Sequence, residues 1–163
     1  MMTDTTPHPL SLRGFLMLVL AGSAATIAFE LYGEVISPLL GGSRLAPVPL
    51  AGSVFKALSG FQSREAANFL HYFAGCIGYP LGFALVARPL WQKFMPGLRW
   101  ALVAVAFGIV QWVFALYVMA HLIAGQAPFL GFTGITWAAL WGHILYALVA
   151  IGLTHHFLLK RSA

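Results

Sequence analysis

The segment LRGFLMLVLAGSAATIAFELYGEVI, residues 12–36, decides how this chain folds. Its apolar residues extend over a length that carries a helix across the roughly 30 Å hydrocarbon core of a bilayer. Two of the four acidic residues in the chain, Glu30 and Glu34, lie one helical turn apart near its end. Because a carboxylate is costly in lipid, we expect Glu30 to face protein, water or an ion.

The composition of the whole chain agrees with this first segment. Its residues are 60% hydrophobic and 8% charged, whereas about a quarter of the residues in a soluble domain are charged. Further apolar runs cover residues 64–87, 98–124 and 135–159. We therefore predict one membrane domain over residues 1–163, an all-α bundle of four transmembrane helices that follows a short tail of residues 1–11. The basic residues lie scattered at the ends of the apolar runs, which indicates the lipid bilayer as partner and not a nucleic acid.

The first apolar run shares features with a secretory signal peptide, namely Arg13, an apolar core and small residues at 22–25. The run continues to Leu31, however, which is longer than the core of most signal peptides. We therefore expect an uncleaved helix, which Ser37-Pro38 should end because proline disfavours a helical residue before it.

The connection from residue 37 to residue 62 is long and still apolar. Within it, the run from Ser53 to Leu58 predicts a short amphipathic helix that lies on the outer face of the bundle. A loop packed over the helix ends is the alternative, and the two are compatible.

Small residues predict where the helices approach one another closely. Gly22 in the first span and Gly75, Gly78 and Gly82 in the second provide such positions, and Gly78-x-x-x-Gly82 matches the spacing of a close-packing face. Pro80 should kink the second span and free a backbone carbonyl one turn earlier, near Cys76.

The basic residues also predict an orientation. With four spans, one side of the membrane collects six of them: Arg13, Arg88, Lys93, Arg99, Lys160 and Arg161. The other side has three, diluted by two carboxylates: Arg44, Lys56, Arg64, Glu34 and Glu65. The positive-inside rule then places both termini in the cytoplasm, and we expect the membrane to be a bacterial inner membrane.

Three ionisable residues from different spans fall at a similar depth near the outer face. Counted at about 1.5 Å per residue, Glu30, His71 and His121 lie within a turn or two of the outer ends of their helices. Two histidines and a carboxylate form the ligand set of non-haem iron sites, and the same groups bind zinc or copper. These residues are the candidate transition-metal ligands. Glu34, Asn68 and Tyr72 lie at a similar depth, where they could hydrogen-bond to these ligands and fix their orientation.

A second histidine position lies deeper. His143 in the fourth span is near Gln111 in depth, and Gly142 leaves space beside its imidazole. A b-type haem between two of His71, His121 and His143 is one interpretation, although His71 and His121 match better in depth. The alternative is a core histidine whose ring bonds to Gln111 or to a backbone carbonyl.

These residues leave several functions open, and no local catalytic motif indicates an enzyme. The chain has no Cys-x-x-Cys, phosphate loop, nucleophile elbow or His-Glu-x-x-His pair. One hypothesis is a metal or haem module with a redox or metal-handling role. The alternatives are an accessory or scaffold subunit of a larger respiratory or photosynthetic membrane complex, in which the same polar residues satisfy one another, and a small transporter or proton path.

Overall fold

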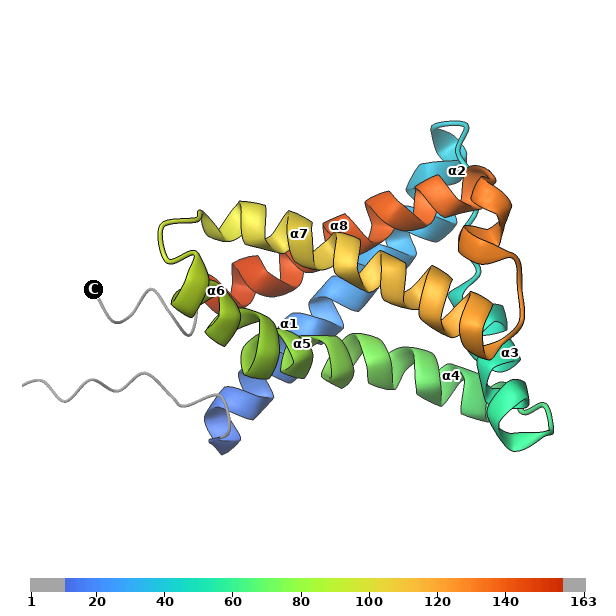
Figure 1. The fold of residues 1–163 in the computed structure, drawn as a ribbon, viewed down its shortest axis with the longest axis horizontal. Coiled ribbons are helices and arrows are strands. Elements are labelled where there is room, and N and C mark those ends of the chain that lie inside the picture. Colours follow the sequence, from blue (N-terminus) through green and yellow to red (C-terminus); the bar gives the residue numbers. More distant parts are fainter. Residues whose placement is uncertain (1–10, 157–163) are drawn as a thin grey trace, which may run out of the picture.

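The computed structural model describes residues 11–156, and over this range the chain is a bundle of helices (Figure 1). Four helices are long and apolar enough to cross a membrane: Leu12–Leu39, Arg64–Phe94, Trp100–Ile123 and Gly134–Thr154. The first contains α1 (Leu12–Leu31), the π-helical turn η1 (Tyr32–Ile36) and α2 (Ser37–Leu39). The second contains α4 (Arg64–Phe73), η2 (Ala74–Gly78), α5 (Tyr79–Gly82), η3 (Phe83–Ala87) and α6 (Arg88–Phe94). The third contains α7 (Trp100–Val113) and the π-helix η4 (Phe114–Ile123), and the fourth is α8 (Gly134–Thr154).

The predicted four-span architecture is confirmed, and helix α8 lies at the centre of it. Its largest interfaces are with α7 and with α1, and small residues allow both. A Cβ atom at Gly108 of α7 would lie 2.7 Å from the Ile144 Cα, and one at Gly142 of α8 would lie 2.8 Å from the Phe29 ring. The helices therefore pack with their backbones close together, as is common where lipid provides no hydrophobic driving force.

Two predicted helix ends are wrong, and both involve proline. The first span continues through Ser37-Pro38 to Leu39, and the second continues through Arg88-Pro89 to Phe94, not ending at residue 87. In each case a π-helical turn comes directly before the residue that precedes proline, so that Ser37 N–H bonds to the Tyr32 carbonyl and Arg88 N–H to the Phe83 carbonyl. The wider turn accommodates the ring and the missing N–H of proline, and the helix goes on.

The carbonyl that each proline leaves without a backbone donor can serve another segment. In a π-helix each N–H bonds to the carbonyl five residues earlier, so the N–H that Pro38 lacks would have bonded to the Gly33 carbonyl. The Gly33 carbonyl accepts the Leu45 N–H instead, at 3.0 Å, which fixes the start of the connection to the second span.

Pro80 has the same effect in the second span. Its π-helical turn pairs Tyr79 N–H with the Ala74 carbonyl, so the freed carbonyl belongs to Gly75, one residue before the position predicted near Cys76. The Tyr146 hydroxyl of α8 donates a hydrogen bond to it. A backbone defect in one span thus forms a polar contact with the central helix.

The amphipathic segment is longer than predicted. Helix α3 covers Pro47–Ser59 and ends at Gly60, whose φ of 82° is the left-handed conformation that glycine adopts readily. It packs against α4 and η4, and Val54 on its inner face is only 1% exposed. Figure 1 places α3 at the end of the bundle opposite the start of α1 and the end of α8. This end is called the α3 end below.

Close helix contacts occur at some of the predicted glycines and not at others. At Gly22, a Cβ would lie 2.5 Å from the Pro80 ring, and Gly75 packs directly on Thr26. Gly82 has no atom within 4 Å of such a Cβ, and Gly78 meets only the Phe73 carbonyl of its own helix. The second span therefore contacts the first through Gly75 and Pro80, and the predicted Gly78-x-x-x-Gly82 positions have no close contact with another helix in the described structure. The predicted tail of residues 1–10 and the end of the fourth span at 157–159 lie outside the described residues.

Candidate binding site

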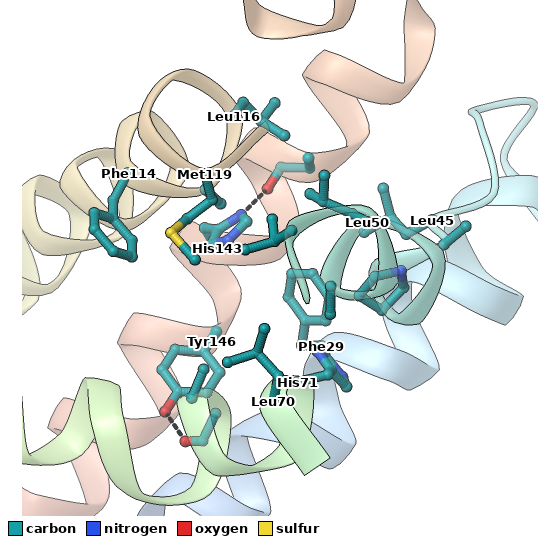
Figure 2. A pocket seen from close by; sticks show the side chains of 18 of the residues that line it. Phe29, Leu45, Leu50, Leu70, His71, Phe114, Leu116, Met119, His143 and Tyr146 are labelled. Atoms are coloured by element: carbon teal, nitrogen blue, oxygen red, sulfur yellow. Dashed lines mark hydrogen bonds between the residues drawn. The ribbon is translucent and has the colours of Figure 1, made fainter. Parts of the chain in front are cut away.

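A cavity of about 170 Å³ lies inside the bundle at the α3 end (Figure 2). All four spans contribute to its wall, α3 covers it, and its surface is mostly apolar. The residues from the spans include Thr26, Phe29, Leu70, His71, Ala74, Gly75, Tyr79, Phe114, Ala115, Leu116, Met119, Ala139, His143 and Tyr146. The covering residues include Leu45, Pro47, Leu50, Ala51, Val54 and Leu130.

Two of the wall segments are π-helical. Gly75 belongs to η2, and Phe114, Leu116 and Met119 belong to η4. Because π-helical turns are rare and are frequently found at functional sites, their presence on two sides of one cavity supports a role in binding.

His143 is a buried polar residue in the wall of this cavity. Its Nδ1 lies 2.7 Å from the Ala139 carbonyl oxygen. A carbonyl only accepts, so Nδ1 carries the proton and donates, and Nε2 of the neutral ring is an acceptor. Within residues 11–156, Nε2 has no hydrogen-bond partner. The ring also meets Phe29 edge to face, with centroids 5.2 Å apart. The imidazole is thus held by the Ala139 carbonyl at Nδ1 and packs against Phe29, while its Nε2 acceptor has no partner.

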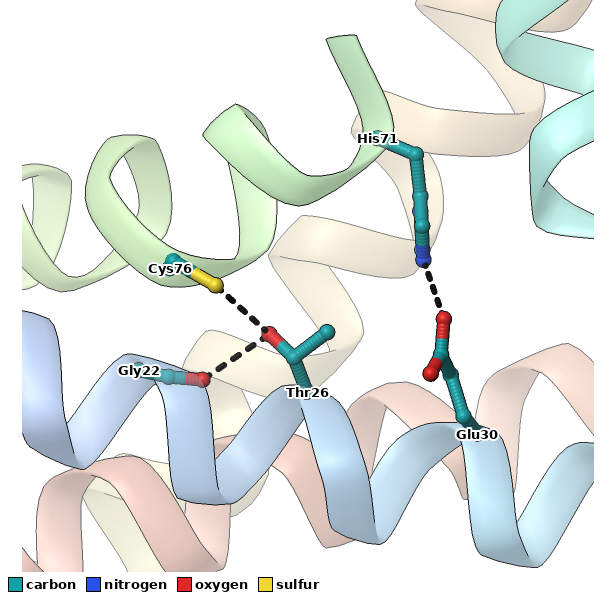
Figure 3. Close-up of polar contacts among 5 residues, drawn as sticks. All are labelled: Gly22, Thr26, Glu30, His71 and Cys76. Carbon is teal, nitrogen blue, oxygen red and sulfur yellow. Dashed lines mark hydrogen bonds and ion pairs between the residues drawn. The ribbon is translucent and has the colours of Figure 1, made fainter. Parts of the chain in front are cut away.

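A second polar pair lies at the edge of the cavity. His71 Nε2 lies 3.1 Å from Glu30 Oε1 (Figure 3). The two side chains are 13% and 28% exposed, respectively, so the carboxylate is the more accessible of the two, and the imidazole also lines the cavity. The Tyr72 hydroxyl approaches the same carboxylate. One proton is shared between Glu30 and His71 whichever of them carries it.

Thr26 forms a smaller contact just below this pair. Its hydroxyl donates to the Gly22 carbonyl at 2.8 Å, and the Cys76 Sγ lies 3.9 Å from its oxygen (Figure 3). The Thr26 hydroxyl proton is therefore used within its own helix, and the Cys76 thiol contacts the same oxygen from the second span.

The third residue of the predicted metal set lies elsewhere. His121 Nδ1 donates to the Gln126 carbonyl at 2.7 Å, and its ring packs on Tyr117. It has no contact with Glu30 or His71. Over the described residues, no three His, Cys, Asp or Glu side chains converge as metal ligands do. The structure thus brings Glu30 and His71 into contact, as the prediction required, but His121 bonds to the Gln126 carbonyl and does not join them.

The geometry also disfavours a haem in this cavity. Phe29 packs against both imidazoles that line it, with ring centroids 5.2 Å from His143 and 6.5 Å from His71. Axial ligands hold haem iron from opposite sides of a flat ring, and Phe29 occupies the space beside both histidines. His71 and His121 do not face each other either, so the donor set does not fit the group.

The remaining predicted residues have local roles. Glu34 forms an exposed ion pair with Arg44 at 3.5 Å, and the Asn68 amide donates to the Arg64 carbonyl of its own helix at 2.9 Å. Gln111 is only 2% exposed, and neither polar atom of its amide has a hydrogen-bond partner in the described part of the chain. It is not bonded to His143, whose partner is the backbone carbonyl of Ala139.

Sequence reasoning missed the cavity itself and ranked His143 below His71 and His121. The one available signal was Gly142 next to His143, which indicated space beside the imidazole. That space is filled by Phe29, and the open volume lies on the side of α3.

Comparison of the chain with protein-family models, with curated proteins and with solved structures finds no match in any of the three.

Proposed function

We propose that this chain is a membrane-embedded binding protein whose cavity takes the hydroxyl-bearing head of a small lipophilic molecule. The observation that carries the proposal is the unpaired Nε2 acceptor of His143, a residue that lines a mostly apolar cavity. A ligand that donates one hydrogen bond and is apolar elsewhere matches this surface.

The size of the cavity sets the size of the head. An engineered apolar cavity of about 150 Å³ binds benzene, and this cavity of about 170 Å³ has room for one six-membered ring with a hydroxyl. A hydrogen bond adds about 0.5–1.5 kcal/mol to such binding, or roughly two- to tenfold in affinity. Shape and apolar contact provide the rest.

The Glu30–His71 pair lies where a second polar group of the ligand would arrive. Glu30 is partly exposed and His71 lines the cavity, so this hydrogen-bonded pair lies between the surface and the cavity.

The test is binding of 4-fluorophenol and fluorobenzene to the purified protein in detergent, followed by ¹⁹F NMR. The two probes differ in one hydroxyl. We expect 4-fluorophenol to bind about fivefold more tightly than fluorobenzene, and the His143→Phe variant to remove this preference. His121→Phe is the matched control, because His121 lies outside the cavity. Equal binding of the two probes to the wild-type protein would refute the proposal.

A cavity-filling variant separates specific binding from partitioning into the micelle. Ala51→Phe adds a ring on the inner face of α3, where Ala51 lines the cavity. Ala57→Phe adds the same ring at an exposed position of the same helix. Loss of 4-fluorophenol binding in the first variant only is the expected result.

The proposed orientation places the α3 end at the outer face of a bacterial inner membrane and both termini in the cytoplasm. It rests on the excess of basic residues at the opposite end, which Arg13, Arg88, Lys93 and Arg99 supply within the described range. Alkaline phosphatase fused after Gly60 should be active, and the same enzyme fused after Gly97 should be inactive. The reverse pattern would invert the assignment. Association with further membrane-protein subunits stays a prediction.

A further inference from the structure

We infer that the ligand enters and leaves through a seam between the second and third spans, so that its tail lies in the bilayer. This inference rests on the proposed function and narrows its ligand to a membrane lipid that has a hydroxylated head and a long apolar tail.

The seam is visible in how the spans pack. The second span has its main interfaces with α1 and with α3, and the third span has its main interface with α8 and a smaller one with α3. The second and third spans meet chiefly at the end away from α3, where Phe83 packs in one buried cluster with Val103 and Ala104. In Figure 1, α4 and the η4 end of the third span both run to the α3 end, where α3 lies next to them. At the other end, the rings of Phe83 and Phe107 meet at 5.6 Å. No hydrogen bond, ion pair or ring contact joins residues 64–82 to residues 108–123 in the described structure.

The cavity reaches the surface at this seam. Phe114 lines the cavity, yet 44% of its surface is exposed. Leu70 and Ala74 of the second span and Ala115 of the third line the same cavity, and two of these four residues carry only a methyl group. Lipid would cover this part of the surface, and all four side chains are apolar, as a passage for an acyl or isoprenoid chain requires.

The covering segment closes the cavity toward the water at the α3 end. Leu45 and Val54 of the covering segment are 5% and 1% exposed, and the Leu45 N–H is fixed to the Gly33 carbonyl. Helix α3 packs on both the second and the third span above the seam. A water-soluble ligand would have to displace this cover, whereas a lipid meets an apolar opening at the depth of its own chain.

The experiment is photolabelling in lipid nanodiscs with 4-dodecylphenol that carries a diazirine at the middle of its chain. Labelled residues are mapped by mass spectrometry. We expect label on residues 70–74 and 114–119, suppressed by excess 4-fluorophenol. It should be about fivefold weaker in His143→Phe, as expected for the loss of one hydrogen bond. His121→Phe, the matched control, should label like the wild-type protein.

Two labelling outcomes would overturn the seam, and a third result would overturn the proposed function. Label spread evenly over lipid-facing positions such as Leu20 and Trp141, which are 69% and 61% exposed, would overturn the seam while 4-fluorophenol still binds in the NMR assay. Label confined to α3 would overturn it as well, because the tail would then pass under the cover. If 4-fluorophenol itself does not bind, the proposed function fails, and the seam fails with it.

Discussion

Tyr146→Phe tests how the bundle uses the backbone carbonyl that Pro80 leaves without a donor. The variant removes only the hydroxyl that bonds to the Gly75 carbonyl, and Tyr146 is 3% exposed. A hydrogen bond contributes about 0.5–1.5 kcal/mol, and an unsatisfied buried acceptor costs about 1–3 kcal/mol. Measured polar contacts in membrane bundles average about 0.6 kcal/mol. We therefore expect the free energy of unfolding to fall by about 1 kcal/mol.

The assay is reversible unfolding in mixed micelles of dodecyl maltoside and sodium dodecyl sulfate. It is repeated in the Pro80→Ala background, where the restored N–H of residue 80 can bond to the Gly75 carbonyl. There the cost of Tyr146→Phe should drop by about half, which makes the two changes non-additive as expected for groups that share a partner. Tyr117→Phe is the control, since Tyr117 is 38% exposed. Equal costs in both backgrounds would refute the explanation, as would a cost no larger than that of Tyr117→Phe.

Three further predictions use the same unfolding assay. Gly22→Ala should destabilise the protein by about 1–3 kcal/mol, because its Cβ would lie 2.5 Å from the Pro80 ring. Gly82→Ala, with no atom within 4 Å, should leave stability unchanged, and similar values for both would contradict the packing. Gln111→Leu should be neutral or stabilising, because both atoms of its buried amide lack a partner in the described residues; a loss above about 2 kcal/mol would indicate a partner for the amide. Glu30→Leu should cost about 1 kcal/mol by removing the partner of His71, and Glu30→Gln should recover most of it; unchanged stability in Glu30→Leu would show that the bond contributes nothing.

The four spans could be predicted because hydropathy is a local property of the sequence. The segments 12–36 and 98–124 are apolar over a length that can cross a membrane, and this property does not depend on the rest of the chain. The helix ends at Ser37-Pro38 and Arg88-Pro89 could not be predicted this way. The rule that proline ends a helix considers an α-helical register, and the chain uses π-helical turns before both prolines.

The candidate site was predicted only in part, because the sequence did not show in which direction around its helix each side chain points. Counting residues gives the depth of a side chain, and it correctly placed Glu30 and His71 at one level. Residue counting does not give the direction in which a side chain points from the helix axis. That direction depends on how the helix packs against several other helices. His121 was therefore grouped with residues it does not face. The cavity depends on how α3 packs over the spans, which no single segment specifies.

The most direct test of the central claim is the ¹⁵N NMR signal of His143 Nε2 in protein with ¹⁵N-labelled histidine. This nitrogen has no hydrogen-bond partner within residues 11–156. We predict that 4-fluorophenol shifts its resonance to lower frequency, as hydrogen bonding to an unprotonated ring nitrogen does, and that fluorobenzene leaves it unchanged. The resonance is assigned by its loss in His143→Phe. An Nε2 signal that stays unchanged with 4-fluorophenol bound in the cavity would contradict the account.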